Sequence, residues 1–277
     1  MRLGGPTFQK NPDPTGWVTE LKQLGYRAAY CPIDETADAQ TVHAFEQVAE
    51  EADIVIAEVG VWNNPLSSDE TKRHRAIELC QQKLDLADAI GARCCVNISG
   101  SRGEVWDGPH PVNYSSDTFD LVVEITRRII DAVRPTRTYF TLETMPWMIP
   151  DSVDSYLDLL RAIDRPRFAV HLDPVNLINT PRLFYQNNIL LRDCFERLGP
   201  YIKSCHAKDI TLASELTVHL SEVRPGLGGL DYVTFLRGLN RLDPDIPLML
   251  EHLPNADDYL ASAKHVREIA EAEGVTL

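Results

Sequence analysis

The chain has 277 residues, of which 44% are hydrophobic and 25% are charged, a composition that is ordinary for a globular protein. Its formal net charge of −14 argues against binding to nucleic acid or to an anionic membrane, because both usually require a basic surface. The sequence begins without the apolar segment of a signal peptide, and no run approaches the ~18 apolar residues of a membrane span, so we expect a cytoplasmic protein.

Short apolar runs alternate with helical patterns along the whole chain. The expected strands cover residues 2–4, 28–31, 54–59, 94–98, 139–143, 168–173, 202–206 and 248–251. Between them, apolar residues recur at helical spacing, as in Ile77, Cys80, Leu84 and Ala87. Ser67 and Glu70 have the spacing of a capping box at the start of that helix.

Strict alternation of strands and helices predicts a parallel sheet, and eight strands over this length favour a closed (β/α)₈ barrel, a TIM barrel. We expect one domain over residues 1–277, since no linker or low-complexity tract divides the chain. Long loops are expected at residues 62–67, 100–116, 180–188 and 210–229. They cluster at the carboxyl ends of the strands, where barrel enzymes place their active sites.

Each of the last four expected strands ends in an ionisable residue. These residues are Glu143, Asp173, His206 and Glu251. In a closed barrel such strand ends converge, and three unpaired carboxylates would repel one another and resist desolvation. A divalent cation removes that cost, and three carboxylates with one imidazole suit Mn²⁺, Mg²⁺, Co²⁺ or Zn²⁺. We therefore expect one divalent ion per chain, with Mn²⁺ preferred.

Several motifs resemble those of the xylose-isomerase-like sugar phosphate isomerase/epimerase superfamily, which includes D-tagatose 3-epimerase, hydroxypyruvate isomerase, inosose dehydratase and endonuclease IV. The matching segments are 142–144 (LET), 171–176 (HLDPVN), 206–209 (HAKD), 225–232 (PGLGGLDY) and 250–252 (LEH). The resemblance implies that Glu143, Asp173, His206 and Glu251 are the metal ligands. It also implies that Glu143 and Glu251 form the catalytic acid–base pair.

The chemistry that follows is proton transfer at a carbon next to a carbonyl group. A hydroxy-ketone chelates the ion, one glutamate removes the proton, and the resulting enediolate is stabilised by the ion as a Lewis acid. Return of the proton gives an epimerase or an isomerase acting on a small carbohydrate or polyol. Loss of a β-hydroxyl group instead gives a lyase, a dehydratase acting on a keto-inositol or keto-sugar.

The sequence departs from the epimerases of this superfamily at two places. Asn176 stands where they have a histidine, and no arginine follows the 206–209 segment. These departures disfavour a ketohexose epimerase, and Lys208 is similar to the lysine of inosose dehydratase and related lyases. Arg224 is a candidate for the missing cation, or else an ordinary surface residue.

Supporting roles are expected for five further residues. Glu58 and Trp62 could face a sugar, Asn97 could hydrogen-bond a hydroxyl group, and Trp147 could form a wall of the pocket. His171 lies two residues before Asp173 on the same side of its strand, so it either orients a ligand or belongs to the core.

Two other functions are less consistent with the sequence. A DNA-repair endonuclease on this fold needs more histidines and a basic surface, and a non-catalytic barrel would not need both glutamates. Association into a homo-oligomer is common for such barrels, but the sequence does not fix it.

Overall fold

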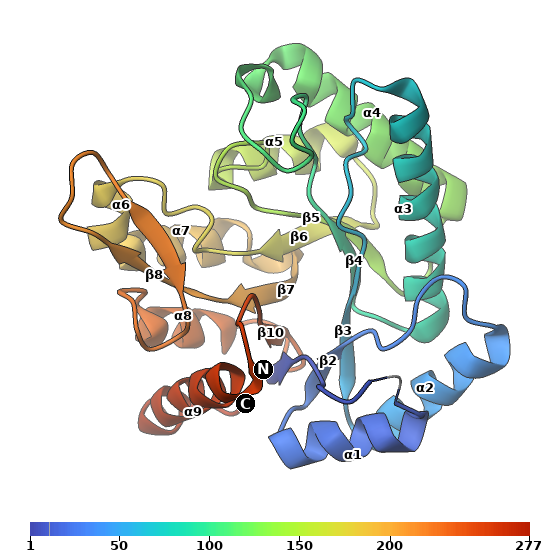
Figure 1. Cartoon of the computed structure of the whole chain (residues 1–277), viewed down its shortest axis with the longest axis vertical. Coiled ribbons are helices and arrows are strands. Elements are labelled where there is room, and N and C mark those ends of the chain that lie inside the picture. Colours follow the sequence, from blue (N-terminus) through green and yellow to red (C-terminus); the bar gives the residue numbers. More distant parts are fainter. Residues whose placement is uncertain (11) are drawn as a thin grey trace.

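Eight parallel strands close into a barrel, and helices follow the strands around its outside (Figure 1). The computed structural model describes residues 1–10 and 12–277. The barrel strands are β1 (Arg2–Gly5), β2 (Ala28–Tyr30), β3 (Val55–Gly60), β4 (Cys94–Asn97), β5 (Tyr139–Glu143), β6 (Phe168–Leu172), β7 (Ile202–Ala207) and β10 (Pro247–Leu250). Hydrogen bonds join β1 to β10 as well as to β2, which completes the barrel. The TIM-barrel prediction is confirmed, and each expected strand is present.

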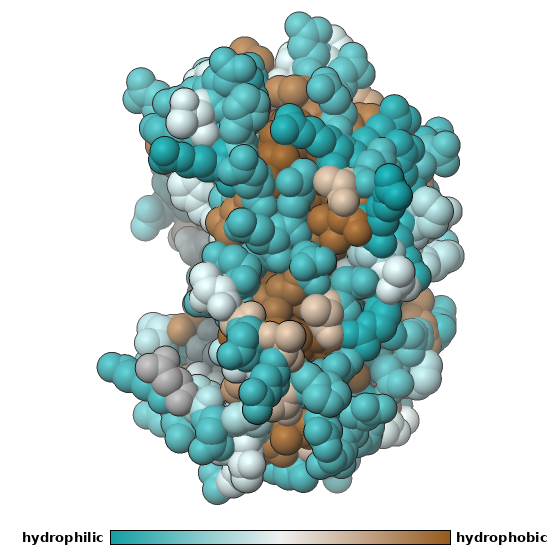
Figure 2. All heavy atoms as spheres, turned by 90° about the vertical axis from the view of Figure 1, so that its right-hand side faces the viewer, coloured by the Kyte–Doolittle hydropathy of each residue, from teal (hydrophilic) through white to brown (hydrophobic). Residues whose placement is uncertain are grey.

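The helices lie between these strands in the order that the periodicity predicts. They are α1 (Pro14–Leu24), α2 (Ala39–Glu51), α3 (Glu70–Ile90), α4 (Ser116–Val133), α5 (Val153–Ile163), α6 (Pro181–Tyr185), α7 (Asn187–Arg197), α8 (Tyr232–Leu239) and α9 (Ala256–Ala272), with short 3₁₀ turns η1 (Pro111–Tyr114) and η2 (Gly199–Tyr201). In α3, Ile77, Cys80, Leu84 and Ala87 are buried against the barrel. The helical side of the molecule seen in Figure 2 is mostly hydrophilic, with smaller apolar areas between the polar side chains.

The start of α3 differs from the prediction. Asp69, and not Ser67, caps this helix, because its carboxylate accepts a hydrogen bond from the backbone N–H of Lys72 at 3.0 Å. The hydroxyl oxygen of Ser67 accepts from the N–H of Asp69, so Ser67 stabilises the turn before the helix. A carboxylate is the better cap here because its charge also interacts favourably with the helix dipole.

Three of the expected long loops contain secondary structure that the sequence did not reveal, and in residues 100–116 it is the 3₁₀ turn η1. Residues 210–229 were expected to be irregular, but β8 (Asp209–Leu212) and β9 (Leu220–Val223) form an antiparallel hairpin within them. The helix α6 occupies part of the expected loop at 180–188. These elements were missed because they are short, and the three apolar residues of α6, Leu183, Phe184 and Tyr185, are too few to show helical periodicity.

The two ends of the described chain meet beside the junction of β1 and β10 (Figure 1). The amino group of Met1 donates to the backbone oxygen of Thr276 at 3.1 Å. Next to it, the Arg2 guanidinium lies 2.9 Å from the Asp53 carboxylate and 2.7 Å from that of Asp245. These contacts connect β1 to the segments before β3 and β10. None of the helices in the described residues is both long and apolar enough to cross a membrane.

Candidate active site

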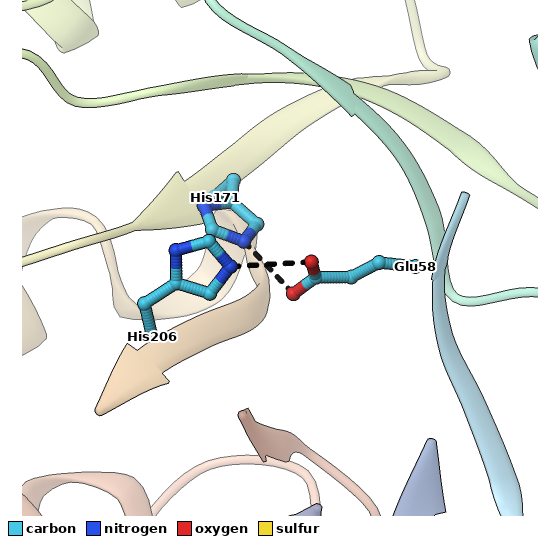
Figure 3. A group of neighbouring side chains, drawn as sticks. All are labelled: Glu58, His171 and His206. Atoms are coloured by element: carbon cyan, nitrogen blue, oxygen red, sulfur yellow. Dashed lines mark hydrogen bonds and ion pairs between the residues drawn. The ribbon is translucent and has the colours of Figure 1, made fainter. Parts of the chain in front are cut away.

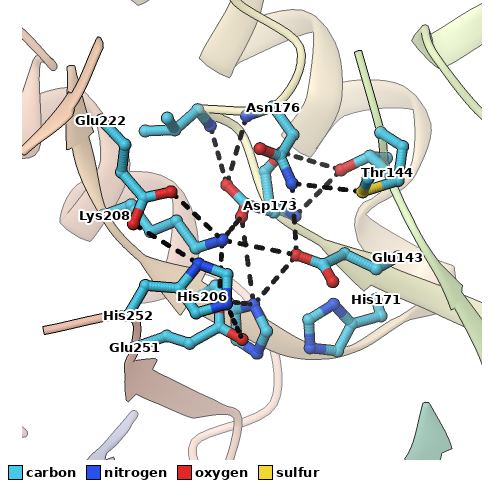
Figure 4. Close-up of polar contacts among 12 residues, drawn as sticks. Glu143, Thr144, His171, Asp173, Asn176, His206, Lys208, Glu222, Glu251 and His252 are labelled. Carbon is cyan, nitrogen blue, oxygen red and sulfur yellow. Dashed lines mark hydrogen bonds and ion pairs between the residues drawn. The ribbon is translucent and has the colours of Figure 1, made fainter. Parts of the chain in front are cut away.

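Four side chains from the ends of neighbouring strands converge at the carboxyl end of the barrel (Figure 4). One oxygen or nitrogen atom from each of Glu143, Asp173, His206 and Glu251 lies within 4.8 Å of the others. His206 is central, because its Nδ1 is 2.8 Å from Glu251 Oε2 and 3.1 Å from Glu143 Oε1. Asp173 Oδ2 is 3.9 Å from the same nitrogen. The sequence prediction thus selected residues that the fold brings together.

Strand register explains this convergence. Glu143 is the last residue of β5, and Asp173 and Glu251 directly follow β6 and β10. His206 lies within β7, where it pairs in register with Met249 of β10. Because side chains alternate along a strand, His171 and Asp173 point to the same side of β6. Ser204, His206 and Lys208 share a side of their segment for the same reason.

Lys208 lies inside this carboxylate cluster, closer to the candidate ligands than its place in the sequence indicates. Its Nζ is 2.8 Å from Asp173 Oδ2 and 2.7 Å from Glu251 Oε2, and the side chain is only 2% exposed. Glu143 Oε1 and Glu222 Oε2 each lie 3.7 Å from it. The ammonium group therefore offsets part of the negative charge that the sequence argument had assigned to a divalent ion alone. Lys208 follows His206 by two residues, and this spacing in the sequence indicates that the two side chains lie on the same side of the chain.

The local charges move the pKa values of the cluster in different directions. Burial would lower the pKa of His206, but the neighbouring carboxylates of Glu251, Glu58 and Glu143 raise it well above its ordinary value. Burial dominates at Glu143 and raises the pKa of that carboxyl group. Burial acts in the same way at Glu251, but the attraction of His206 and Lys208 outweighs it and lowers the pKa.

The donor set of the cluster fits a divalent cation. Asp173 Oδ2 and Glu251 Oε2 are buried and lie 2.8 and 2.7 Å from Lys208 Nζ, and Glu251 Oε2 is also 2.8 Å from His206 Nδ1. A carboxylate offers about four acceptor positions, so the three carboxylates together can contact these basic groups and still supply oxygen ligands to a cation. Three carboxylates and one imidazole can supply oxygen and nitrogen ligands to Mg²⁺, Mn²⁺, Co²⁺ or Zn²⁺. The geometry is compatible with a metal site but does not select one ion.

Glu58 does not face a sugar-binding surface, contrary to expectation. It is 1% exposed, and its carboxylate contacts the imidazole rings of His171 and His206, as Figure 3 shows. Glu58 Oε1 lies 2.9 Å from His171 Nε2, and Oε2 lies 3.2 Å from His206 Nε2. The neighbouring imidazoles lower the pKa of Glu58 despite the opposing effect of burial. His171 is fully buried, as a core residue would be, and it also contacts Glu58, which in turn contacts the candidate ligand His206.

Asn97 is fully buried and so is not placed to contact a substrate as expected, whereas Arg224 pairs with a residue of α9. The buried Asn97 amide accepts from the backbone N–H of Asn63 at 3.0 Å and donates to its side-chain oxygen at 2.8 Å, so it fixes the loop after β3. The Arg224 guanidinium lies 3.4 Å from the Asp258 carboxylate at the start of α9. Both side chains are used within the protein, which spacing in the sequence could not show.

Asn176, Trp62 and Trp147 border the cluster or the loops around it. Asn176 Nδ2 donates to Glu143 Oε1 at 3.3 Å. The Trp62 ring is 39% exposed, with its centroid 6.4 Å from that of His206, so it can contact a ligand bound over the cluster. Trp147 is equally exposed, and its Nε1–H donates to the backbone oxygen of Asp107 at 2.6 Å. This hydrogen bond joins the segment after β5 to the loop after β4.

Three further side chains near Glu251 were not found from the sequence. His252 Nε2 lies 3.4 Å from Glu251 Oε1, and His252 Nδ1 lies 3.5 Å from Glu222 Oε1. Glu222 is carried by β9, so it could not be placed before the hairpin was known. The Tyr30 hydroxyl donates to the backbone oxygen of Leu250 at 3.1 Å, next to Glu251.

A closed parallel barrel with a cluster of potential metal ligands at the carboxyl ends of its strands is the architecture of a TIM-barrel protein with its site at the usual end of the barrel. The family model of the xylose isomerase-like TIM barrel matches residues 18–269, and the chain belongs to this family.

Comparison with individual proteins gives relatives with different reactions. A 3-dehydroshikimate dehydratase of Bacillus anthracis is 27% identical over 144 residues, which is 52% of this chain and 46% of that protein. The chain thus matches about half the length of this curated relative. Among solved structures, the probable 3-DHS dehydratase AsbF of Bacillus anthracis superposes with a TM-score of 0.71 at 18% identity, covering 98% of this chain and 99% of that one.

Two other solved structures share the fold at lower identity. D-psicose 3-epimerase of Clostridium cellulolyticum H10 gives a TM-score of 0.69 at 12% identity over 100% of both chains. A xylose isomerase-like TIM barrel protein of Mycobacterium smegmatis in complex with magnesium gives 0.68 at 14% identity, over 98% of this chain and 96% of that one. At these identities the likeness shows the fold alone.

Proposed function

We propose that this protein is a divalent-metal-dependent isomerase or epimerase that moves a proton at the carbon next to the carbonyl group of a hydroxy-ketone sugar or polyol. The observation that carries the proposal is the position of Glu143 and Glu251, which approach His206 from two different strands, β5 and β10. Two carboxylates around one centre provide a base and an acid for the same substrate carbon. Membership of the family supports the proposal, because related proteins include epimerases and a dehydratase.

The ligands of the ion would be Glu143, Asp173, His206 and Glu251. A divalent ion held there supplies Lewis-acid stabilisation of the negative charge that develops on the substrate oxygen. One glutamate takes the proton from carbon, and the second returns a proton to the opposite face or to the neighbouring carbon. Asn176 holds one oxygen of Glu143 and so restricts the direction of that carboxylate. The exposed ring of Trp62 offers an apolar face to a sugar.

A lyase is the second candidate, and Lys208 is the observation that favours it. Its ammonium group is buried beside Asp173 and Glu251, where it can donate a hydrogen bond to a departing hydroxyl group. An isomerase has no leaving group that needs such a donor. The sequence match to a 3-dehydroshikimate dehydratase points in the same direction. The substrate of the lyase would be a keto-inositol, a keto-sugar or a similar cyclic hydroxy-ketone.

Incubation with a panel of hydroxy-ketones in D₂O tests the common step and separates the two outcomes. We expect deuterium to enter the carbon next to the carbonyl group in the presence of Mn²⁺ and not after chelation of the ion. An epimerase or isomerase returns a labelled carbohydrate of unchanged composition, whereas a lyase releases water and forms an unsaturated ketone that absorbs in the ultraviolet. Lys208→Met should abolish formation of the unsaturated product while leaving exchange measurable. Absence of exchange with every substrate and ion would reject the proposal.

A further inference from the structure

Glu58 contacts one ring nitrogen of His206, and the other ring nitrogen faces the carboxylates of the cluster. His206 Nδ1 faces Glu143 and Glu251, whereas its Nε2 lies 3.2 Å from Glu58 Oε2. Figures 3 and 4 show the two sides of the same imidazole. Glu58 comes from β3, which is not a neighbour of β7 in the barrel, so this contact crosses the interior. Glu58 therefore acts on His206 without joining the ligand cluster.

The contact constrains which nitrogen of His206 carries a proton. A carboxylate can only accept, so a neutral His206 must direct Nε2–H to Glu58 and present the lone pair of Nδ1 to the cluster. An imidazole that donates one N–H to a carboxylate is a stronger and better-oriented metal ligand through its other nitrogen. We propose that Glu58 is a positioning residue that fixes the orientation and tautomer of His206 as a metal ligand. This inference rests on the proposed metal-dependent function.

Glu58 is itself held in place by residues of β6 and β7. Its Oε1 accepts from Ser204 and lies 2.9 Å from His171 Nε2. His171 and Ser204 are partners in the register of β6 and β7, so they present adjacent groups to one oxygen. Ser204 lies two residues before His206 on the same side of β7. The carboxylate therefore has defined partners for both oxygens and little freedom to turn.

The trio of Glu58, His171 and His206 could instead be read as a second metal site, because one atom of each lies within 4.8 Å of the others. The contacts favour hydrogen bonding. The distances of 2.9 and 3.2 Å between Glu58 and the two rings are those of N–H···O bonds. The trio also supplies only three ligands and is fully buried, whereas a closed structural site normally has four. The number of ions bound per chain distinguishes the two readings.

Two substitutions of Glu58 test the proposal through metal affinity. Glu58→Gln keeps the size of the side chain and removes its charge, while Glu58→Asp keeps the charge and withdraws it from His206 by one methylene group. We expect both to weaken Mn²⁺ binding by about 10–100-fold in titration calorimetry, as loss of an outer partner of a metal-bound histidine commonly does. The d–d spectrum of the Co²⁺-loaded protein should also change, because it reports on ligand geometry. At saturating metal, KM for the substrate should stay nearly constant.

Glu222→Gln is the matched control for charge alone. Glu222 lies near Lys208 and His252 but makes no contact with His206, so we expect its loss to change Mn²⁺ affinity by less than about 3-fold.

Should both Glu58 variants fail to fold, Ser204→Ala should weaken Mn²⁺ binding in the same direction by a smaller factor. If the wild-type protein binds no divalent ion, the proposed function fails. If it binds one ion and the tested variants of Glu58 or Ser204 bind as tightly, only the present inference fails. Two ions per chain, one of them lost in the Glu58 variants, would also overturn it.

Discussion

Glu143 and Glu251 have the same side chain in different surroundings. Glu251 has basic neighbours on several sides, with Lys208 Nζ at 2.7 Å and His252 Nε2 at 3.4 Å in addition to His206. Glu143 accepts from the neutral amide of Asn176, and Lys208 lies farther away at 3.7 Å. Burial raises the pKa of Glu143, whereas the basic neighbours of Glu251 outweigh the effect of burial and lower the pKa of that carboxyl group.

Replacing Glu251 with glutamine should lower kcat by at least ~10²-fold, because an amide cannot take or return a proton at neutral pH. The corresponding Glu143 variant should show a similar loss. Under saturating Mn²⁺, which compensates for weaker metal binding, deuterium exchange with each epimer of the substrate gives a finer measurement. Each variant should retain exchange from one face of the carbon and lose it from the other. Full activity in either variant would exclude that glutamate from the reaction.

The sequence identifies the four ligand candidates better than it identifies their partners. Glu143, Asp173, His206 and Glu251 were accessible because each is the polar end of an apolar strand. Glu58 has the same strand context, but its role depends on β6 and β7, which lie more than a hundred residues away in the sequence. A contact across the barrel interior leaves no trace in local spacing. The same limitation explains why Asn97 was assigned to a substrate that its buried side chain is not positioned to contact.

At the level of elements, Asp209 organises the segment that carries Glu222 over the site. Its Oδ2 accepts from the backbone N–H groups of Gly226 and Gly228, each at 3.0 Å. Its Oδ1 accepts from the N–H of Leu230 at 2.9 Å and from that of Ile210. A side chain at position 228 would collide with this carboxylate, and Gly226 has a φ of +94°, so both positions favour glycine. The P-G-x-G motif is thus explained by the carboxylate that its backbone surrounds.

Asp209→Asn should destabilise the protein by at least about 2 kcal/mol, because the amide NH₂ group would face two backbone donors that now share a carboxylate oxygen. Denaturant unfolding measures the loss, and hydrogen exchange should show faster opening at Gly226, Gly228 and Leu230. Asp231→Asn is the matched control. Asp231 caps α8, and asparagine caps a helix about as well as aspartate does, so this variant should change stability by less than about 0.5 kcal/mol. Equal losses in the two variants would contradict the role given to Asp209.

The predictability of each element follows the apolar content of its sequence. The barrel strands are buried on both faces and appear as apolar runs, which is why all eight were predicted. In β9 the two middle residues, Ser221 and Glu222, are exposed, so this strand resembles a polar loop. Its pairing with β8 is set by the backbone hydrogen bonds between the two strands. Such an element cannot be recognised from hydrophobic periodicity.

At the scale of the whole molecule, closure of the barrel brings the first strand against the last and surrounds Arg2 with acidic groups. Asp53 accepts from Arg2 and Arg27, and these contacts lower its pKa to about 2. In the unfolded chain the pKa of aspartate is about 3.9. The charged carboxylate therefore favours the folded state above pH 4, and this contribution disappears as the pH falls through 2.

Asp53→Asn removes this titration and should be less stable than the wild-type protein at pH 6. The difference between the two should narrow as the pH is lowered from 4 to 2, because the wild-type carboxylate becomes protonated in the folded state. Urea unfolding across this range measures both proteins under the same conditions. A difference that is independent of pH would show that Asp53 stabilises the barrel through its neutral contacts only.

Binding of a divalent ion should stabilise the barrel as a whole, because its four proposed ligands come together only when β5, β6, β7 and β10 are assembled. The unfolded chain has no such site, so an ion at 100 times its Kd adds about 2.7 kcal/mol to the free energy of unfolding. For a chain of this size we expect the Tm to rise by roughly 5 °C or more on addition of Mn²⁺ to chelator-treated protein. Asp173→Asn is the comparison, because it removes one ligand charge. It should lose most of the rise, whatever its own Tm in the absence of metal. An equal rise in Tm for both proteins would show that the ion binds elsewhere. If none of Mn²⁺, Mg²⁺, Co²⁺ and Zn²⁺ raises the Tm of the wild-type protein, a metal-dependent reaction at this cluster loses its basis.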